Sequence, residues 1–262
     1  MPSKLLLFFA SACFSCHTKN HTAIVSISSN VKPVDTNTGR NIFPTINDIP
    51  LPENFIRSGA DSNSFAGWLR CVHLKSDKTV YLFDGRLKQN QQAQFAVLDI
   101  SVPHKDLQQC ADAVMRLRAE YLFAQKKFEA IHFTDNANTV YTFHAPYTRE
   151  NFMGYLETVF GMCGSASLSK QLKAVTDFST IQPGDVLIRG GFPGHAVIVM
   201  DVAENNAGKK IFMLAQSYMP AQDIHLLVNP NNEKLSPWYE VDEARQIITP
   251  EYLFYKTELK TW

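Results

Sequence analysis

One stretch in the C-terminal half constrains the fold more than any other part of the sequence. Two apolar segments, 185–188 and 195–202, flank a loop of glycine, phenylalanine and proline at 190–194. Along 195–202 both alternating sets of side chains are largely apolar, which is typical of a strand buried on both faces in the middle of a sheet. A polar turn at 204–208 then leads into a third apolar segment, 210–217. The pattern predicts adjacent antiparallel strands at the centre of one sheet.

Upstream of these strands the sequence favours helices. Apolar residues recur at intervals of three and four, which places them on one face of a predicted helix. This stripe consists of Leu107, Cys110, Val114, Leu117 and Tyr121. If Asp106 caps the helix, Cys110 lies about one turn inside it. Further helices are predicted at 64–69, 149–160 and 167–175.

The N-terminus predicts export. A lysine precedes a short apolar run at 5–12, which cannot span a bilayer and is typical of a signal peptide over 1–16. The Ala-Ser-Ala sequence before Cys13 is similar to a bacterial lipoprotein box, in which the cysteine is acylated after cleavage. Cys16 is a second candidate, and a secretory signal cut without lipidation stays open. An acylated Cys13 would attach the protein to a membrane by lipid alone.

Composition divides the rest of the chain into two parts. Residues 17–45 are rich in Ser, Thr, Asn and Lys and are predicted to form a flexible tether. Residues 46–262 are predicted to form a single domain, and we expect an α+β fold because helices precede antiparallel strands. With a lipid anchor, this organisation predicts a domain on the outer membrane of the bacterial cell envelope. The membrane face and the oligomeric state stay open.

The charge balance and the motifs exclude several classes of protein. The chain has 25 Lys and Arg against 25 Asp and Glu, so it lacks the basic excess of a nucleic-acid binder. It contains no phosphate loop and no dinucleotide-binding turn. It also lacks the paired cysteines of a zinc site. We therefore expect no nucleic-acid partner, no cofactor and no metal site.

His195 is the strongest candidate for chemistry. It begins the central apolar strand, where the backbone would hold it rigidly and the glycine loop would leave it partly open, as a general base requires. A structural histidine bonded to a loop carbonyl is the alternative. A turn of two or four residues would place Gln216 and Tyr218 opposite or diagonal to His195 on the returning strand. The Gln216 amide could then hold one tautomer of the imidazole.

Cysteines supply the candidate nucleophiles. Cys71, Cys110 and Cys163 lie in the predicted domain, and an odd number leaves at least one thiol unpaired. Cys110 precedes His195 on a predicted helix, although its place on the apolar stripe fits a core residue equally well. Cys163 and Ser217 are alternative nucleophiles, and Cys71 fits this role worst.

The strand, glycine loop and His195 strand together resemble the histidine motif of papain-like cell-wall peptidases of the NlpC and CHAP type. In those enzymes a cysteine at the start of a helix attacks an amide, and a histidine at the start of a later strand takes its proton. A polar residue on the neighbouring strand orients the histidine. The resemblance implies a papain-like helix packed on an antiparallel sheet, with Cys110 as nucleophile, His195 as base and Gln216 as the orienting residue. The substrate would then be a peptide of peptidoglycan or an acylated compound.

Longer runs resemble an uncharacterised lipoprotein family of Bacteroidetes-type bacteria, a domain of unknown function. These runs are 106–113, 116–122, 193–199, 216–225, 236–239 and 249–251. The resemblance implies an envelope location and one domain, and it assigns no activity.

Polar and aromatic residues near the end of the returning strand predict a binding surface. The candidates are Gln109, Tyr218, Gln222, His225 and Trp238. A hydrogen-bonded surface turn and, for Trp238, a place in the core are the alternatives. Two functions follow: a cysteine hydrolase that cleaves an amide bond, or a non-catalytic lipoprotein that binds cell-wall fragments, a glycan or a protein partner.

Overall fold

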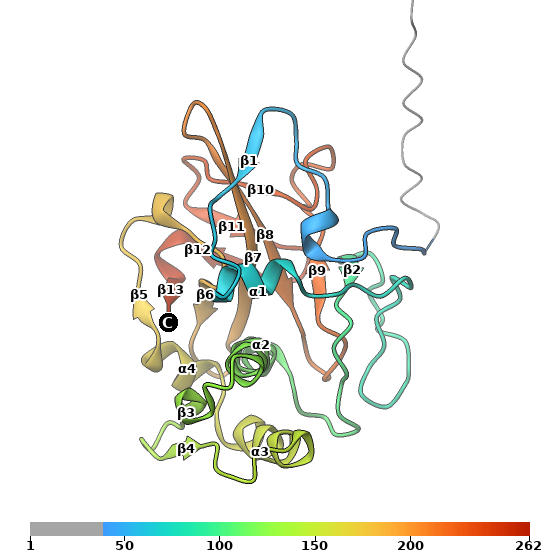
Figure 1. Cartoon of the computed structure of the whole chain (residues 1–262). Coiled ribbons are helices and arrows are strands. Elements are labelled where there is room, and N and C mark those ends of the chain that lie inside the picture. The colour runs from blue at the N-terminus through green and yellow to red at the C-terminus, as the bar shows by residue number, and fades with distance from the viewer. Residues whose placement is uncertain (1–38) are drawn as a thin grey trace, which may run out of the picture. The chain divides into compact units, whose positions relative to one another are not determined.

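The computed structural model describes residues 39–262, which form one compact unit (Figure 1). Within these residues, nine strands form one antiparallel sheet whose main path runs β2–β9–β8–β7–β6–β13–β5, while β1 pairs with β7 and β10 with β8. The strands of this sheet are β1 (Phe55–Arg57), β2 (Gln94–Val97), β5 (Lys173–Ala174), β6 (Val186–Arg189), β7 (His195–Asn205), β8 (Lys210–Gln216), β9 (His225–Leu227), β10 (Tyr239–Glu240) and β13 (Leu259–Thr261). Two separate hairpins consist of β3 (His132–Thr134) with β4 (Val140–Thr142), and β11 (Gln246–Ile248) with β12 (Leu253–Tyr255).

Helices cover one side of this sheet. The α-helices of the described part are α1 (Phe65–Arg70), α2 (Cys110–Ala124), α3 (Arg149–Met162) and α4 (Ser165–Gln171). Its 3₁₀ turns are η1 (Ile46–Asp48), η2 (Phe128–Ala130), η3 (Phe178–Thr180) and η4 (Lys256–Glu258). Helix α2 packs against β7, and α3 lies on the far side of α2 (Figure 1). Ser64 and Thr148 begin α1 and α3 by accepting backbone N–H bonds with their hydroxyls, as expected of N-cap residues.

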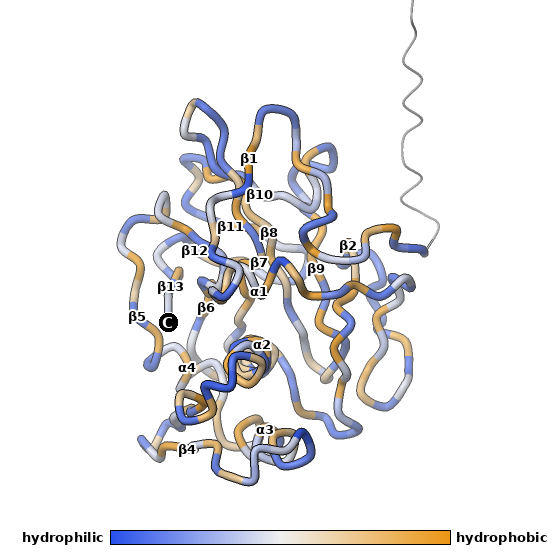
Figure 2. Tube along the Cα trace, viewed as in Figure 1, coloured by the Kyte–Doolittle hydropathy of each residue, from blue (hydrophilic) through white to orange (hydrophobic). Residues whose placement is uncertain are grey.

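Strand β7 separates two hydrophobic cores. Ala196 and Ile198 pack in the core that contains α2, whereas Val197 and Val199 pack in the core that contains Phe254 of β12. The central strands and α2 accordingly carry orange segments in Figure 2, and the peripheral loops carry more blue. The prediction that this strand is buried on both faces is confirmed.

The predicted α+β, papain-like fold is wrong. The protein is mainly a large antiparallel sheet with few helices, since short segments add strands to both sides of the predicted central hairpin. Three of these segments, 55–57, 225–227 and 259–261, are too short to show a clear alternation of polar and apolar residues. By contrast, the predicted strand at 79–83 forms only isolated bridges, Tyr81 with Leu87 and Leu82 with Gln222.

The N-terminal boundary differs slightly from the expected one. Arg40 pairs with Asp77 and Thr45 pairs with His73, so sheet-like contacts begin ahead of the expected boundary at residue 46. The predicted signal peptide, the lipidation candidate Cys13 and its alternative Cys16 lie outside the described residues. In the part from 39 to 262, no helix has the length and apolarity that a bilayer crossing requires.

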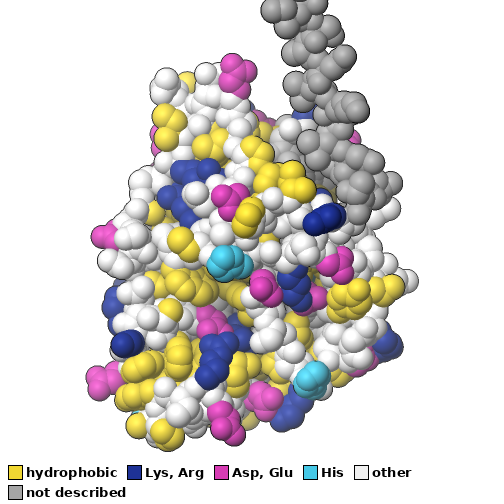
Figure 3. All heavy atoms as spheres, turned by 45° about the vertical axis from the view of Figure 1, so that its right-hand side comes forward, with side chains coloured by type: hydrophobic (Ala, Val, Ile, Leu, Met, Phe, Trp, Pro, Cys, Tyr) yellow, Lys and Arg dark blue, Asp and Glu magenta, His cyan; other side chains and the backbone are white. Residues whose placement is uncertain are grey.

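Charges of both signs alternate over the visible surface. On the face shown in Figure 3, dark blue and magenta side chains are interspersed, with yellow apolar groups between them. This face therefore offers no single-sign patch to a strongly charged partner.

Candidate functional site

The register of β7 and β8 decides which side chains face His195. Near the hairpin Glu204 lies opposite Lys210, and farther along Ile198 lies opposite Ala215. Between these pairs a bulge at Val199/Asp201 shifts the register by one residue. When the shifted register is continued to the end of the strands, Tyr218 falls opposite His195 and Gln216 diagonal to it. Gln216 and Tyr218 therefore lie opposite or diagonal to His195, as predicted. The reason differs from the predicted one, because the bulge sets this register and a hairpin turn of two or four residues does not.

A chain of hydrogen bonds begins at His195. Its Nε2 lies 2.9 Å from Gln216 Oε1, and Gln216 Nε2 donates to Glu251 Oε2 over 2.7 Å. Glu251 also accepts bonds from Lys88 Nζ at 2.8 Å and Asn90 Nδ2 at 3.2 Å.

The chemistry of this chain fixes the tautomer of His195. An ionised carboxylate only accepts, so the Gln216 amide nitrogen must face Glu251 and its oxygen must face His195. The imidazole therefore carries its proton on Nε2 and leaves Nδ1 as a free base. Nδ1 is buried and has no hydrogen-bond partner within residues 39–262.

Aromatic rings enclose this imidazole. Its ring centre lies 4.8 Å from those of Tyr218 and Tyr252 and 5.8 Å from that of Phe254. His195 is 1% exposed. Burial lowers its pKa to about 4, against the opposing effects of the Gln216 bond and the Glu251 charge. His195 is therefore neutral near pH 7, the protonation state of a general base.

Cys110 is the first residue of α2 rather than a residue one turn inside it. Its φ is +23° and that of Gln108 is +68°, and both values lie in the left-handed region that breaks a helix. The expected cap, Asp106, instead accepts bonds from Gln109 Nε2 at 2.8 Å and from the Ala221 N–H at 2.7 Å. Gln109 is the N-cap, and its N–H donates to Asp112 Oδ2 over 3.0 Å. The helix start brings Cys110 to the position that a nucleophile at a helix terminus occupies.

The Cys110 thiol is protonated at neutral pH. It is 7% exposed, and burial, followed by the charge of Asp112, raises its pKa to about 12. Cys110 is not part of the hydrophobic core around α2, whereas Cys163 is. Burial first, then nearby acidic side chains, raises the pKa of Cys163 to about 11. Within the described residues Cys71, Cys110 and Cys163 are all free thiols, and Cys71 is exposed.

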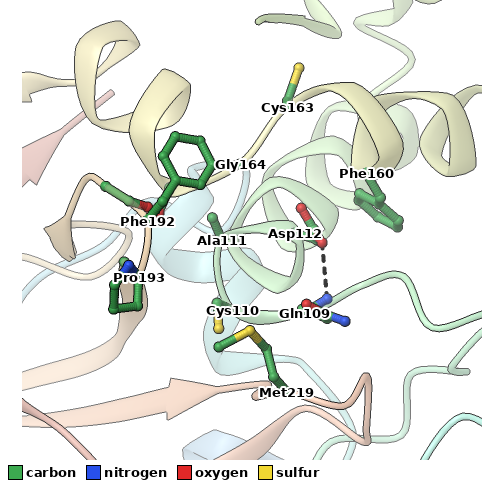
Figure 4. A pocket seen from close by; sticks show the side chains of 13 residues that line it. Gln109, Cys110, Ala111, Asp112, Phe160, Cys163, Gly164, Phe192, Pro193 and Met219 are labelled. Atoms are coloured by element: carbon green, nitrogen blue, oxygen red, sulfur yellow. Dashed lines mark hydrogen bonds between the residues drawn. The ribbon is translucent and has the colours of Figure 1, made fainter. Parts of the chain in front are cut away.

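A pocket of about 440 Å³ opens over Cys110 (Figure 4). Its lining residues come from the start of α2, from α3 and α4, from the β6–β7 loop and from the segment after β8. They are Gln109, Cys110, Ala111, Asp112, Phe160, Cys163, Gly164, Ser165, Gly191, Phe192, Pro193, Gly194 and Met219. The pocket therefore reaches Gly194, the residue immediately before His195.

Tyr218 connects the two candidate catalytic groups. Helix α2 packs on one face of β7, and the His195 ring contacts Phe254 on the other face, so the two side chains approach the end of the strand from opposite faces. Tyr218 contacts the His195 ring, and its pKa is raised first by burial and then by the charge of nearby Cys110. No hydrogen bond joins Cys110 Sγ to His195, whose Nδ1 has no partner within residues 39–262.

The other predicted binding residues lie in different surroundings. Gln109 lines the pocket and Tyr218 lies beside His195. Gln222, His225 and Trp238 are at most 1% exposed and are not among the pocket residues. The structure does not bring these three side chains to the site.

Several side chains in this buried region form hydrogen bonds to backbone carbonyls. His225 Nδ1 lies 2.9 Å from the Asp223 carbonyl, and burial lowers the pKa of His225 to about 3. The Trp238 indole donates to the Pro50 carbonyl over 3.1 Å. Ser217, the alternative nucleophile, donates its hydroxyl to the Gln222 carbonyl over 2.9 Å.

Sequence reasoning missed three residues of the site: Glu251, Lys88 and Asp112. Glu251 belongs to the run 249–251 that carries the family resemblance, which is the one signal that pointed to it. Asp112 likewise belongs to the run 106–113 of that resemblance, whereas nothing in the sequence marks Lys88, because its role depends on a contact across the fold. Residues 39–262 contain no group of three His, Cys, Asp or Glu side chains that could hold a metal ion.

Comparison with known proteins gives one match. The sequence model of a protein family described as a domain of unknown function (4846), DUF4846, matches residues 46–145 and 134–261. No curated protein and no solved structure matches the chain. The expected membership of an uncharacterised family is therefore confirmed, while the papain-like and Bacteroidetes-lipoprotein resemblances gain no support from these comparisons.

Proposed function

The chain belongs to the family described as a domain of unknown function (4846), and we propose that it is a cysteine hydrolase that cleaves an amide bond. In this proposal Cys110 is the nucleophile, His195 the general base and Gln216 the residue that orients His195. Glu251 is a positioning residue that acts through Gln216.

The proposed reaction has two steps. Cys110 Sγ and His195 Nδ1 are not hydrogen-bonded in this structure, so the first step requires them to approach each other. The Cys110 proton then passes to His195 Nδ1 while Sγ bonds to the carbonyl carbon of the substrate. The carbon–nitrogen bond then breaks, and the amine leaves with the proton from the imidazolium. Water next attacks the thioester, again with His195 as base, and releases a carboxylic acid and the free thiol. The Asp112 N–H already donates to the Gln109 carbonyl over 2.6 Å, so the N–H groups of Cys110 and Ala111 at the start of α2 would offer hydrogen bonds to the oxyanion.

The hydrogen-bond chain of His195, Gln216 and Glu251 carries this proposal. It holds the imidazole in the Nε2–H tautomer and leaves Nδ1 unprotonated and without a hydrogen-bond partner in residues 39–262, as a general base requires. Because the thiol and the imidazole are both neutral, proton transfer accompanies attack and no ion pair forms beforehand.

Burial of both groups favours a second function. His195 is 1% exposed and Cys110 is 7% exposed, and His195 does not line the pocket. A protein that only binds cell-wall fragments, a glycan or a partner needs no accessible base. In that case Cys110 forms the floor of a binding pocket.

An activity assay separates these functions. Purified full-length protein is incubated with peptides released from bacterial cell walls, and new amines and carboxylic acids are followed by mass spectrometry. The hydrolase proposal expects turnover that Cys110→Ala lowers about 10⁴-fold or more and that Cys71→Ala leaves unchanged. Intact-mass analysis of a stopped reaction should show an acyl adduct on Cys110. Equal turnover by wild-type protein and Cys110→Ala would contradict the proposed nucleophile.

We also propose that the protein is a lipid-anchored component of the bacterial cell envelope, on the basis of the Ala-Ser-Ala-Cys sequence that ends at Cys13. Metabolic labelling with a fatty-acid analogue tests this proposal. Label should disappear in Cys13→Ser and persist in Cys16→Ser. Loss of label only in Cys16→Ser would show that Cys16, and not Cys13, is the lipidated residue. No label in the wild-type protein would contradict lipidation.

A further inference from the structure

The walls of the pocket over Cys110 are apolar. Phe160 comes from α3, Phe192 and Pro193 from the loop before β7, and Met219 from the segment after β8. In Figure 4 these side chains are arranged around Cys110 and the start of α2. Three separate segments of the chain thus contribute large apolar groups to one pocket, and its volume of about 440 Å³ is within the usual range for small-molecule sites.

Two of these groups are left uncovered by the fold. Phe192 is 89% exposed and Met219 is 49% exposed. Large apolar side chains that gather at the rim of a pocket are typical of a surface that another apolar group covers. A methionine is also adaptable in shape, which suits contact with a flexible ligand.

The pocket lacks a counter-charge for an ionic ligand. No Lys or Arg is among its lining residues, and Asp112 is its one acidic residue. Asp112 Oδ2 already accepts the Gln109 N–H over 3.0 Å, and burial raises the pKa of this carboxyl well above its ordinary value. A ligand carboxylate or ammonium would therefore lose its hydration without gaining a partner.

We propose that this pocket takes an uncharged aliphatic acyl chain, so that the bond presented to Cys110 is the amide of an N-acylated amine. The proposal rests on the hydrolase function for its chemistry: water is consumed, the carbon–nitrogen bond breaks, and a fatty acid and an amine are released. The pocket itself requires only that the acyl chain binds beside the thiol.

Binding to the full-length Cys110→Ala protein tests the pocket without turnover. The probes are N-acyl glycinamides with chains of two, four, six and eight carbons, and the readout is the Kd by calorimetry. Each added methylene should tighten binding by up to about 4-fold, the equivalent of about 0.8 kcal/mol. Adding Phe192→Ser should flatten this dependence. The matched control, Ile56→Ser, removes an apolar residue that is 69% exposed on β1 outside the pocket, and it should preserve the dependence.

Hydrolysis of the same probes by the wild-type protein separates the two proposals. Binding that depends on chain length without release of glycinamide would support the acyl pocket and contradict the hydrolase. Release of glycinamide at a rate independent of chain length would support the hydrolase and contradict the acyl pocket. A Kd that does not change with chain length, or tighter binding of a dipeptide with a free carboxylate, would also overturn the pocket proposal.

Discussion

At the scale of single residues, Glu251 acts on His195 through an intermediate amide. Gln216 stands between them, and Lys88, which is 6% exposed, compensates the Glu251 charge. In catalytic triads a third residue likewise orients the imidazole through a hydrogen bond. Each hydrogen bond fixes the orientation of the next group, so a substitution of Glu251 should alter the tautomer of His195.

Glu251→Gln should release this constraint. The Gln216 amide could then rotate, and Lys88 would lose its buried anionic partner, so we expect a loss of about 3 kcal/mol in the free energy of unfolding. Nitrogen NMR of His195 should show a mixture of tautomers in place of the Nε2–H form. Glu157→Gln is the control, because its pair with Lys105 is exposed, and it should change stability by less than about 1 kcal/mol. An unchanged tautomer in Glu251→Gln would contradict the orienting role.

The buried histidines should make stability depend on pH. The pKa of His195 falls from 6.5 in the unfolded chain to about 4 in the folded state, and that of His225 falls to about 3. Well above pH 6.5, as at pH 7.5, both histidines are almost entirely neutral in both states. As the pH drops below 6.5, the unfolded chain binds protons that the folded state does not bind, so stability falls. At pH 5 each histidine should lower the free energy of unfolding by about 2 kcal/mol relative to pH 7.5.

Urea unfolding at several pH values measures this effect. His195→Gln should remove about half of the loss between pH 7.5 and pH 5, whatever its effect at pH 7.5. His132→Gln, at an exposed position, should keep the whole loss. Equal pH dependence in all three proteins would show that His195 is protonated in the folded state.

At the scale of elements, the loop between β6 and β7 positions both the pocket rim and His195. A Cβ on Gly194 would lie 2.2 Å from Ser165 Oγ and 2.6 and 2.7 Å from the carbonyls of Arg189 and Gly191. Two of these three neighbours are backbone atoms, which cannot rotate away. The loop therefore depends on glycine at this position to pack against the start of α4.

Gly194→Ala should displace this loop. We expect a loss of about 1–3 kcal/mol in the free energy of unfolding, as for other overpacked positions. Gly154→Ala is the matched control: it lies inside α3 with nothing within 4 Å of an added Cβ, and it should gain about 0.5–1 kcal/mol. Thermal unfolding of both proteins measures the difference. Equal stability of the two variants would show that the loop shifts freely.

At the scale of the whole molecule, Asp201 ties the N-terminal elements to the central strand. Its side chain is fully buried on β7 and accepts Arg57 Nε at 2.7 Å and Arg70 Nε at 2.6 Å. Arg57 lies on β1 and Arg70 ends α1, so one carboxylate connects β7 to two elements that lie more than 130 residues before it in the sequence.

Asp201→Asn should weaken this junction. Two partly buried guanidinium groups would lose their counter-charge, and we expect a loss of about 3–5 kcal/mol in the free energy of unfolding. The control Asp84→Asn affects an exposed pair with Arg86 and should cost less than about 1 kcal/mol. Hydrogen exchange should rise in β1 and α1 of Asp201→Asn. Unchanged exchange there would contradict the connecting role.

Several elements were predictable because their signals are local. The continuous apolar run along 195–202 predicted the central strand, and the helix predicted at 149–160 is α3, which extends over Arg149–Met162. Helix α2 was predicted from its apolar stripe, but its start was not. The left-handed backbone at Gln108 and Cys110 delays the first turn, and apolar spacing carries no information about that conformation.

Sequence alone therefore determined that β7 is central and that His195 begins it. Only the tertiary structure decided the rest of the site. The bulge at Val199/Asp201 sets the register, and Glu251 reaches Gln216 across 35 residues of chain. Burial, which raises the pKa of Cys110 and lowers that of His195, arises from side chains that meet only when the sheet has assembled. Periodicity records the neighbours of a residue along the chain, whereas protonation and register depend on neighbours that the fold brings together.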